Sequence, residues 1–343
     1  MRKVAVEQAV GMVLGHDITR IIPGQEKVRA FKRGQIIQVS DLEVLKNLGK
    51  EHIFVWEEDD EANLVHEDEA ARRLAEAACG AGISFGQPNQ GKVELKADYD
   101  GLLKIDLERQ NQLNDLEDVI LASLHTNRAV KKEQILAGTR ITPLAIPKAK
   151  MLEAEAICRS QSEPLIQVKP YQPRWVALVT TGSEVFSGRI KDGSQALIKS
   201  KINPFGGRFL GQSIVPDQTE VIAKEIRRYL AEGAEMVFVS GGMSVDPDDV
   251  TPSAIRSVAA EVVFYGAPVL PGSMFMLAYQ GKVPICGLPG CIMFNKQTIL
   301  DLLLPRLFAG EHIKRREVMT LGQGGLCQNC PVCHYPDCAF GKA

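Results

Sequence analysis

The sequence contains little that would direct it to a membrane or to nucleic acid. Its 343 residues carry 40 Lys and Arg against 42 Asp and Glu, so no overall field attracts nucleic acid or anionic lipid. No apolar run approaches the roughly 18 residues of a membrane-spanning helix. The apolar opening stretch is interrupted by Glu7, His16 and Asp17, unlike a signal peptide. We therefore expect a cytoplasmic protein without a nucleic-acid or membrane partner.

Length and composition are those of a globular protein with several domains. Charged residues make up 24% and hydrophobic residues 45% of the chain, and the length suggests two or three domains. Three prolines in EPLIQVKPYQPRW mark an extended connector. The predicted units are a small mixed α+β unit (1–60), a helix followed by a β-rich unit with a further helix near 115–124 (61–170), an α/β domain (174–311) and a Cys-rich C-terminal tail (312–343).

Strand and helix signals alternate in residues 174–311. WVALVTTG, RFLGQSIV, MVFVSGG, EVVFYG and VPICGLPG have the apolar content of buried strands, and TEVIAKEIRRYLAEG has the spacing of an amphipathic helix. A further helix is expected from Ser194, and a closing helix over 292–308. This alternation predicts a three-layer α/β domain with a mostly parallel sheet.

Polar and Gly-rich segments follow these strands, where ligands bind in parallel sheets. The glycines permit turns in which backbone N–H groups approach a phosphate, and helix starts at Ser194, Thr219 and Thr251 add partial positive charge. Carboxylates crowd the same rim, which favours a shared Mg²⁺. The acids Asp217 and Asp249 lie near expected helix starts, so capping is an equally plain interpretation of either one alone.

The segments TGSEVFSGRIKDGS, VPDQTEVI, SGGMSVDPDDVTPSAI, LPG and GLPG, in this order, resemble the molybdopterin-binding domain of the molybdopterin molybdotransferases (the MoeA family) and related adenylyltransferases. The resemblance is strong from 174 to about 308 and much weaker before. It implies molybdopterin or its adenylylated form as ligand, molybdate and Mg²⁺ as co-reactants, and a homodimer.

By this resemblance, four acids stand at catalytic or metal-binding positions of the family: Glu184, Asp192, Asp217 and Asp249. The family's Asp before Glu184 is Ser183 here. The residues expected to hold the pterin and its phosphate are those of the turns and helix starts: Thr181, Gly182, Ser194, Ser240, Gly241, Gly242, Ser244, Thr251, Gly272, Pro289 and Gly290.

One segment departs from the family. Where the family has K-P-G-K-P before the last strand, this chain has LPGSM, with Leu270 and Ser273 in place of both lysines. Cys291 stands where P-G-N-P-x-S has Asn. Losing two positive charges removes favourable energy for an oxyanion. Pterin binding is therefore expected to survive more readily than molybdate insertion, and Cys291 is either a small core residue or a thiolate facing the ligand.

The last 17 residues contain four of the eight cysteines, Cys327, Cys330, Cys333 and Cys338, with His334 among them. Four soft ligands with spacing C-x2-C-x2-C-x4-C predict a metal site, with zinc as the first choice and an iron–sulfur cluster as the second, since the last spacing differs from the x3 and proline of ferredoxins; no stable metal is the third alternative. So short a tail is expected to be disordered without its metal.

Three functions remain open. The chain is a molybdotransferase that inserts molybdate with release of AMP, or a non-catalytic carrier or sensor that hands the finished cofactor to a molybdoenzyme, the tail serving for docking. GSEVFSGRIKDGS with DPDDVT is also similar to the CinA family of nucleotide pyrophosphatases, although that family normally begins with the α/β domain.

Overall fold

A computed structural model describes residues 1–20 and 28–342, and the chain divides into two compact units. Unit 1 comprises residues 1–98, 105–126 and 132–168, and unit 2 comprises 99–104, 127–131 and 169–343. The C-terminal tail thus belongs to the same unit as the predicted α/β domain. Across the described residues, no helix is both long and apolar enough to span a bilayer.

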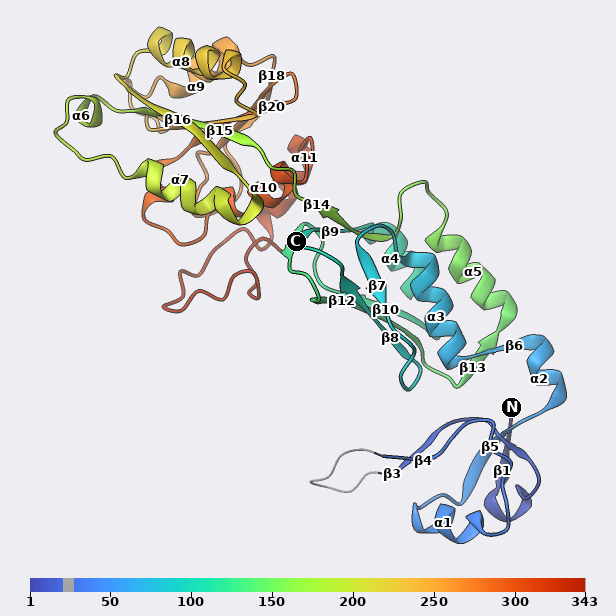
Figure 1. Ribbon diagram of the computed structural model, residues 1–343. Helices are drawn as coiled ribbons and strands as arrows, with labels where there is room; N and C mark the ends of the chain where they lie inside the picture. The colour runs from blue at the N-terminus through green and yellow to red at the C-terminus, as the bar shows by residue number, and fades with distance from the viewer. Residues whose placement is uncertain (21–27, 343) are drawn as a thin grey trace. The chain divides into compact units, whose positions relative to one another are not determined.

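Unit 1 begins with small sheets around an apolar cluster (Figure 1). The strands β1 (Arg2–Ala5), β5 (His52–Trp56) and β2 (Val13–Leu14) form an antiparallel sheet, and β3 (Ile18–Arg20) pairs with β4 (Val28–Phe31). The helix α1 (Asp41–Asn47) places Leu45 in the cluster. A 3₁₀ turn, η1 (Val6–Gln8), follows β1.

The rest of unit 1 is an antiparallel sheet with helices. The strands β10 (Val119–Ser123), β12 (Ile135–Ile141), β8 (Lys92–Ala97) and β7 (Ile83–Phe85) lie in that order, and α3 (Glu67–Ala78) buries its alanines and Leu74. The remaining elements are α2 (Glu58–Asn63), β6 (Leu64–His66), α4 (Leu107–Asn114), β13 (Ala145–Pro147) and α5 (Lys148–Cys158).

The helix predicted near 115–124 is wrong. Residues Val119–Ser123 form β10 instead, because their alternating apolar side chains pair in register with β12. The preceding helix α4 ends at Asn114, whose side-chain amide donates to the carbonyl of Leu121 at 3.1 Å and so fixes the turn into the strand.

Unit 2 is built on a six-stranded sheet of order β16-β15-β17-β20-β19-β18. The first four strands are parallel and β19 runs opposite to them, so that β18, which pairs antiparallel with β19, runs in the same direction as the first four. Their bounds are β15 (Trp175–Thr181), β16 (Arg208–Val215), β17 (Met236–Ser240), β18 (Glu261–Tyr265), β19 (Met276–Gln280) and β20 (Val283–Leu288). The sequence patterns do not single out β19 as a strand. It pairs antiparallel with both of its neighbours, β20 and β18. The domain is α/β as expected.

Alternate residues of the central strands face two separate apolar clusters. Val176 and Leu178 join one cluster with α7 (Ser194–Ile202) and α10 (Ile299–Phe308), while Ala177 and Val179 join the other with α8 (Thr219–Ala231) and α9 (Thr251–Val258). Helices therefore cover both faces of the sheet, as Figure 1 shows.

The remaining elements are short, and some of them lie at the boundaries between the two units in the sequence. Strand β9 (Gly101–Ile105) pairs with β11 (Arg128–Val130), and β14 (Ile166–Pro170) is the third strand of that sheet. The short helices are α6 (Ser183–Phe186), η2 (Asn203–Phe205), η3 (Gly290–Met293), α11 (Arg315–Met319) and η4 (Thr320–Gly322). The closing helix predicted over 292–308 begins only at Ile299, because Thr298 and Asp301 form a capping box there.

Candidate functional site

Five loops of unit 2 share one edge of the six-stranded sheet. The parallel strands β15, β16, β17 and β20 end there, and antiparallel β19 begins there, since Met276 pairs with Gly287 near the end of β20. In the sheet, β16 lies on one side of β15 and β17 lies on the other. Strand connections thus diverge between β15 and β17, where ligands bind in open α/β sheets.

Backbones approach closely at this divergence. Gly241 follows β17 with φ +103°, and a Cβ placed on it would lie 2.2 Å from the carbonyl oxygen of Thr181 at the end of β15. Neighbouring Gly242 has φ +56°, and a Cβ there would lie 2.9 Å from the Thr251 hydroxyl and 3.7 Å from Oδ1 of Asp217. Only glycine fits this approach, which brings Thr181, Asp217, Gly242 and Thr251 together.

Asp217, after β16, orders the turn after β15. Its carboxylate accepts hydrogen bonds from the Thr181 hydroxyl and, on Oδ2, from the backbone N–H and hydroxyl of Ser183 at 2.7 and 3.1 Å. From sequence, Ser183 is notable only as a lost acid. The contact with Asp217 explains why serine replaces the family's aspartate at this position. An aspartate at 183 would bring a second carboxylate next to Asp217, whereas the serine hydroxyl donates a hydrogen bond to it.

Thr251 begins α9, and its hydroxyl is buried without a hydrogen-bond partner among the described residues. Its backbone N–H donates to the carbonyl of Gly242 at 3.2 Å. A buried hydroxyl without a partner costs folding free energy. Its place at a helix start beside Gly242 makes it a group that a bound anion could satisfy.

A second polar group lies at the start of α7. Asp192 accepts from the backbone N–H and hydroxyl of Ser194 at 3.0 and 2.6 Å and from the Gln212 amide at 2.8 Å. That amide also donates to Thr180, whose hydroxyl lies 2.9 Å from that of Ser194. Partial burial tends to raise the pKa of Asp192, but these hydrogen bonds outweigh it, so the pKa is lowered. The sequence does not predict Thr180 and Gln212 as site residues. The alternation of apolar and polar residues in a strand shows which face of the sheet a side chain is on, but not which residues it contacts.

The other predicted residues occupy the same edge without joining either group. Glu184 lies in α6, and its carboxylate would be 3.0 Å from a Cβ on Gly182. Asp249 accepts from the backbone of Asp246 at 3.2 Å, and the carbonyl of Ser244 accepts from Tyr265 at 3.3 Å. Ser240 ends β17, Pro289 and Gly290 lead into η3, and Gly272 packs against Ile299.

The predicted acids do not form one cluster. Among residues 1–20 and 28–342, no group of three or more His, Cys, Asp or Glu side chains is placed to hold a metal ion. The expectation that carboxylates crowd around a shared Mg²⁺ is therefore not supported. Asp217 and Asp192 instead accept hydrogen bonds from the backbone N–H groups of Ser183 and Ser194. Neither Asp217 nor Asp249 caps the helix that follows it, since α8 and α9 have no side-chain cap hydrogen bond.

The tail closes the far end of this edge. Leu270, in the position of the family's first lysine, forms a parallel bridge with Leu326: its backbone N–H donates to the carbonyl of Gly325 and its carbonyl accepts from the N–H of Cys327, each at 2.8 Å. Tyr335 donates to the carbonyl of Asp301 at 3.2 Å, and Phe340 is 4% exposed in the cluster shared with α10. The expectation that the tail is disordered without its metal does not include these contacts. They form because the tail packs against the apolar core of the α/β domain.

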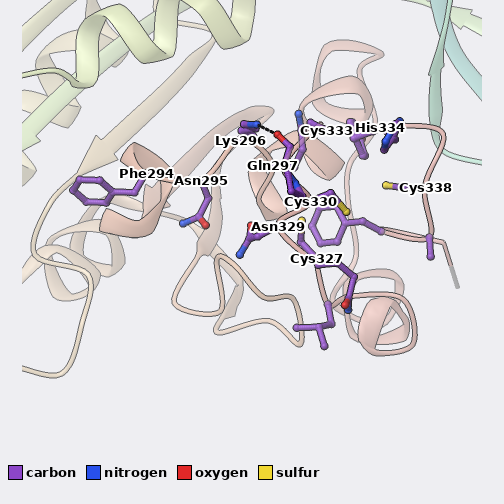
Figure 2. A pocket seen from close by; sticks show the side chains of 16 residues that line it. Phe294, Asn295, Lys296, Gln297, Cys327, Asn329, Cys330, Cys333, His334 and Cys338 are labelled. Atoms are coloured by element: carbon purple, nitrogen blue, oxygen red, sulfur yellow. Dashed lines mark hydrogen bonds between the residues drawn. The ribbon is translucent and has the colours of Figure 1, made fainter.

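The four tail cysteines are reduced and do not close on a single ion. Cys327 and Cys338 are half-buried, while Cys330 and Cys333 are exposed. With loop residues 294–297, they line a cavity of about 340 Å³, and Figure 2 shows these side chains around it. Cys291 is not among the residues that line this cavity, and burial raises the pKa of its thiol, which favours the thiol form.

Comparison with known proteins identifies the domain that carries this edge. Residues 177–309 match the family described as a probable molybdopterin binding domain. This segment is therefore similar to that domain family, and the chain resembles molybdopterin molybdenumtransferases over about half of its length. Residues 3–57 match a family described as a domain of unknown function.

The curated relatives that the chain matches are distant and longer. The molybdopterin molybdenumtransferase of Synechococcus elongatus is 24% identical over 184 residues, 50% of this chain and 42% of the relative. That of Staphylococcus aureus is 25% identical over 193 residues, 52% and 44% of the two chains. The match thus spans less than half the length of these relatives. Among solved structures, the molybdopterin biosynthesis enzyme MoaB of Thermus thermophilus is 23% identical, with a TM-score of 0.36 over 40% of this chain and 98% of that one.

Proposed function

We propose that this protein acts in molybdenum cofactor biosynthesis by binding molybdopterin, or its adenylylated form, between the ends of β15 and β17. The observation that carries the proposal is the group of Thr181, Asp217, Gly242 and Thr251, in which a buried hydroxyl beside a glycine turn has no hydrogen-bond partner among the described residues. The phosphate of the ligand would accept from Thr251 and from the N–H groups of Gly241 and Gly242.

The acids have separate parts in this proposal. Asp217 holds the turn at Ser183 that one wall of the site needs, and Asp192 holds the start of α7 through Ser194. Mg²⁺ is commonly bound through one or two carboxylates together with substrate phosphates, so Asp249 with the ligand's phosphate would suffice. When bound, the cation would neutralise charge on the phosphate linkage. Glu184 would face the ligand from α6.

Insertion of molybdate with release of AMP is the finer proposal. It requires the site to hold an oxyanion next to the pterin, although Leu270 and Ser273 replace the two lysines of the family motif. The dimer that the resemblance implies is a further proposal, and size-exclusion chromatography with light scattering tests it.

A carrier function is the second candidate, and the contact between Leu270 and the tail favours it. The segment that would hold molybdate is instead paired with Leu326. A carrier would bind the finished cofactor and release it to a molybdoenzyme without consuming the adenylylated form.

A direct binding experiment tests the site. Titration of the full chain with molybdopterin and with its adenylylated form, with and without Mg²⁺, should show binding. Thr251→Val should weaken it roughly tenfold or more without lowering stability, because the hydroxyl it removes has no partner. The matched control is Thr219→Val at the start of α8, which should leave affinity unchanged. Equal affinity for wild type and Thr251→Val would contradict the proposed site.

Turnover separates the activities. Release of AMP from the adenylylated pterin on addition of molybdate and Mg²⁺ would establish the molybdotransferase, and retained binding without AMP release would favour the carrier. Hydrolysis of ADP-ribose without pterin affinity would instead indicate a CinA-like pyrophosphatase and overturn the proposal.

A further inference from the structure

The tail cavity has walls from two segments of unit 2. Residues 294–297 come directly from η3 at the candidate site, and 326–340 come from the tail. All four tail cysteines line it, together with the aromatic side chains of Phe294, Tyr335 and Phe340. Figure 2 shows the labelled cysteines among the side chains that line the cavity, and a dashed line marks the hydrogen bond from Lys296 Nζ to the carbonyl of Pro331, 2.9 Å long.

The size of this cavity is wrong for one metal ion. Four thiolates bound to one zinc at about 2.3 Å place neighbouring sulfur atoms about 3.8 Å apart. Within the described parts of the chain, no three His, Cys, Asp or Glu side chains are placed to hold a metal ion directly. A cavity of about 340 Å³ has room for an occupant of several atoms, since a water molecule takes up about 30 Å³.

The spacing of the cysteines also favours an occupant of several atoms over a single metal ion. Structural zinc sites commonly use separate pairs of ligands, each pair on its own turn. In C-x2-C-x2-C, by contrast, the middle residue Cys330 would have to belong to both turns. Three cysteines at this spacing are typical of a loop that binds an iron–sulfur cluster. Cys338, three residues after Tyr335, also lines the cavity and is available as a fourth ligand.

The loop is held in place at both ends by contacts that do not involve the thiols. Cys327 donates its backbone N–H to Leu270 at 2.8 Å, and Gly341 donates to Gly324 at 2.9 Å, next to buried Phe340. Cys330 and Cys333 remain exposed and can adjust. Lys296 lies on the cavity wall, where its ammonium group would offset the negative charge of a thiolate-bound cluster.

We propose that Cys327, Cys330, Cys333 and Cys338 bind an iron–sulfur cluster in this cavity. Each thiol releases its proton to solvent as its sulfur bonds to iron. The cluster fixes the tail against Leu270, at the end of the rim where the family's lysines are missing. The proposal is independent of pterin binding, which is measured separately.

The experiment uses the full chain, expressed and purified without oxygen and reconstituted with a mixture of ferrous and ferric iron and with sulfide. We expect iron and acid-labile sulfide in equal amounts, little zinc, and broad visible absorption that bleaches on reduction. Cys330→Ser and Cys333→Ser should lose this absorption. These positions are exposed, so the variants should keep the wild-type unfolding transition. Cys291→Ser, a control outside the cavity, and His334→Ala should retain the cluster.

Three results would overturn the proposal. They are stoichiometric zinc in place of iron, wild-type protein that takes up no iron and sulfide under these conditions, and full cluster content in both serine variants. Wild-type metal and sulfide content decides the question even if a variant unfolds. Pterin affinity measured on the same samples distinguishes failure here from failure of the proposed function.

Discussion

The two ends of the binding edge are built by different means. On the acidic side, comprising the loops after β15, β16 and β17, carboxylates of Asp217 and Asp192 hold backbone N–H groups close by. On the tail side, comprising residues 266–275 and 289–298, the contacts come from the C-terminal tail, which pairs its backbone with Leu270 and packs Tyr335 and Phe340 against the apolar core.

The difference indicates which part of the site is general and which is particular to this chain. The acidic side is held by glycine turns and by carboxylate hydrogen bonds between loops that follow neighbouring strands, and it is the side where we propose that an anion binds. The tail side has lost the lysines of the resembling family and gained a thiol-lined cavity instead. Perturbing each side separately therefore tests whether they act independently.

The largest effect is expected from Gly241→Ala on the acidic side. Its Cβ would lie 2.2 Å from the Thr181 carbonyl oxygen at φ +103°, so β15 and β17 must separate, at a cost of about 3 kcal/mol or more in the free energy of unfolding. Gly233→Ala is the matched control, because it has φ +91° and nothing within 4 Å; it should cost about 1–2 kcal/mol. Urea denaturation measures both, and equal losses would show that the close approach is not required.

The next largest effect is expected from Phe340→Ala on the tail side. Phe340 is 4% exposed in a core shared with α10, and truncating a buried phenylalanine costs about 3 kcal/mol. We expect a lower urea midpoint together with faster proteolysis of the tail. Val332→Ala, at a position 66% exposed, should change stability by less than about 0.5 kcal/mol. A tail cleaved as slowly in Phe340→Ala as in wild type would show that it is not anchored through this core.

Sequence patterns predicted the acidic side better than the tail side. Alternating apolar strands and glycine turns such as SGG are local signals, so the α/β class and the shared edge of Gly182, Gly241 and Asp217 followed from them. The hydrogen bonds of Ser183 and Gln212 did not, because they depend on which strands become neighbours.

The tail could not be placed from its sequence. Its contacts depend on β19 running antiparallel, which brings Leu270 to the binding edge, and strand order is not encoded in local periodicity. The cysteine spacing indicated a metal site, but whether four thiols surround one ion or a larger cavity is a property of the folded loop. The wrong helix at 115–124 has a related cause, since pairing with β12 overrides helical spacing.

A moderate effect is expected from Asp217→Ala. The Thr181 hydroxyl and the Ser183 backbone N–H would lose their acceptor, which should lower stability by about 1–3 kcal/mol and weaken pterin binding. Asp217→Asn retains an acceptor oxygen and should recover most of the stability. Asp249→Ala, where the carboxylate accepts only from Asp246 within the described structure, should leave stability nearly unchanged. If Asp249→Ala proved the more destabilising, Asp249 rather than Asp217 would be the acid that holds the edge together.

The smallest effect concerns pH and the acidic side alone. Hydrogen bonds from Ser194 and Gln212 outweigh burial and lower the pKa of Asp192 in the folded state. The unfolded chain therefore binds this proton more tightly, and the stabilisation is present above the ordinary carboxyl pKa of about 4 and lost as pH falls through the lowered one. Urea midpoints measured from about pH 6 to pH 3 should fall less steeply for Asp192→Asn than for wild type. Parallel curves would mean that Asp192 does not hold the start of α7 through its charge, and the acidic side would then depend on Asp217 alone.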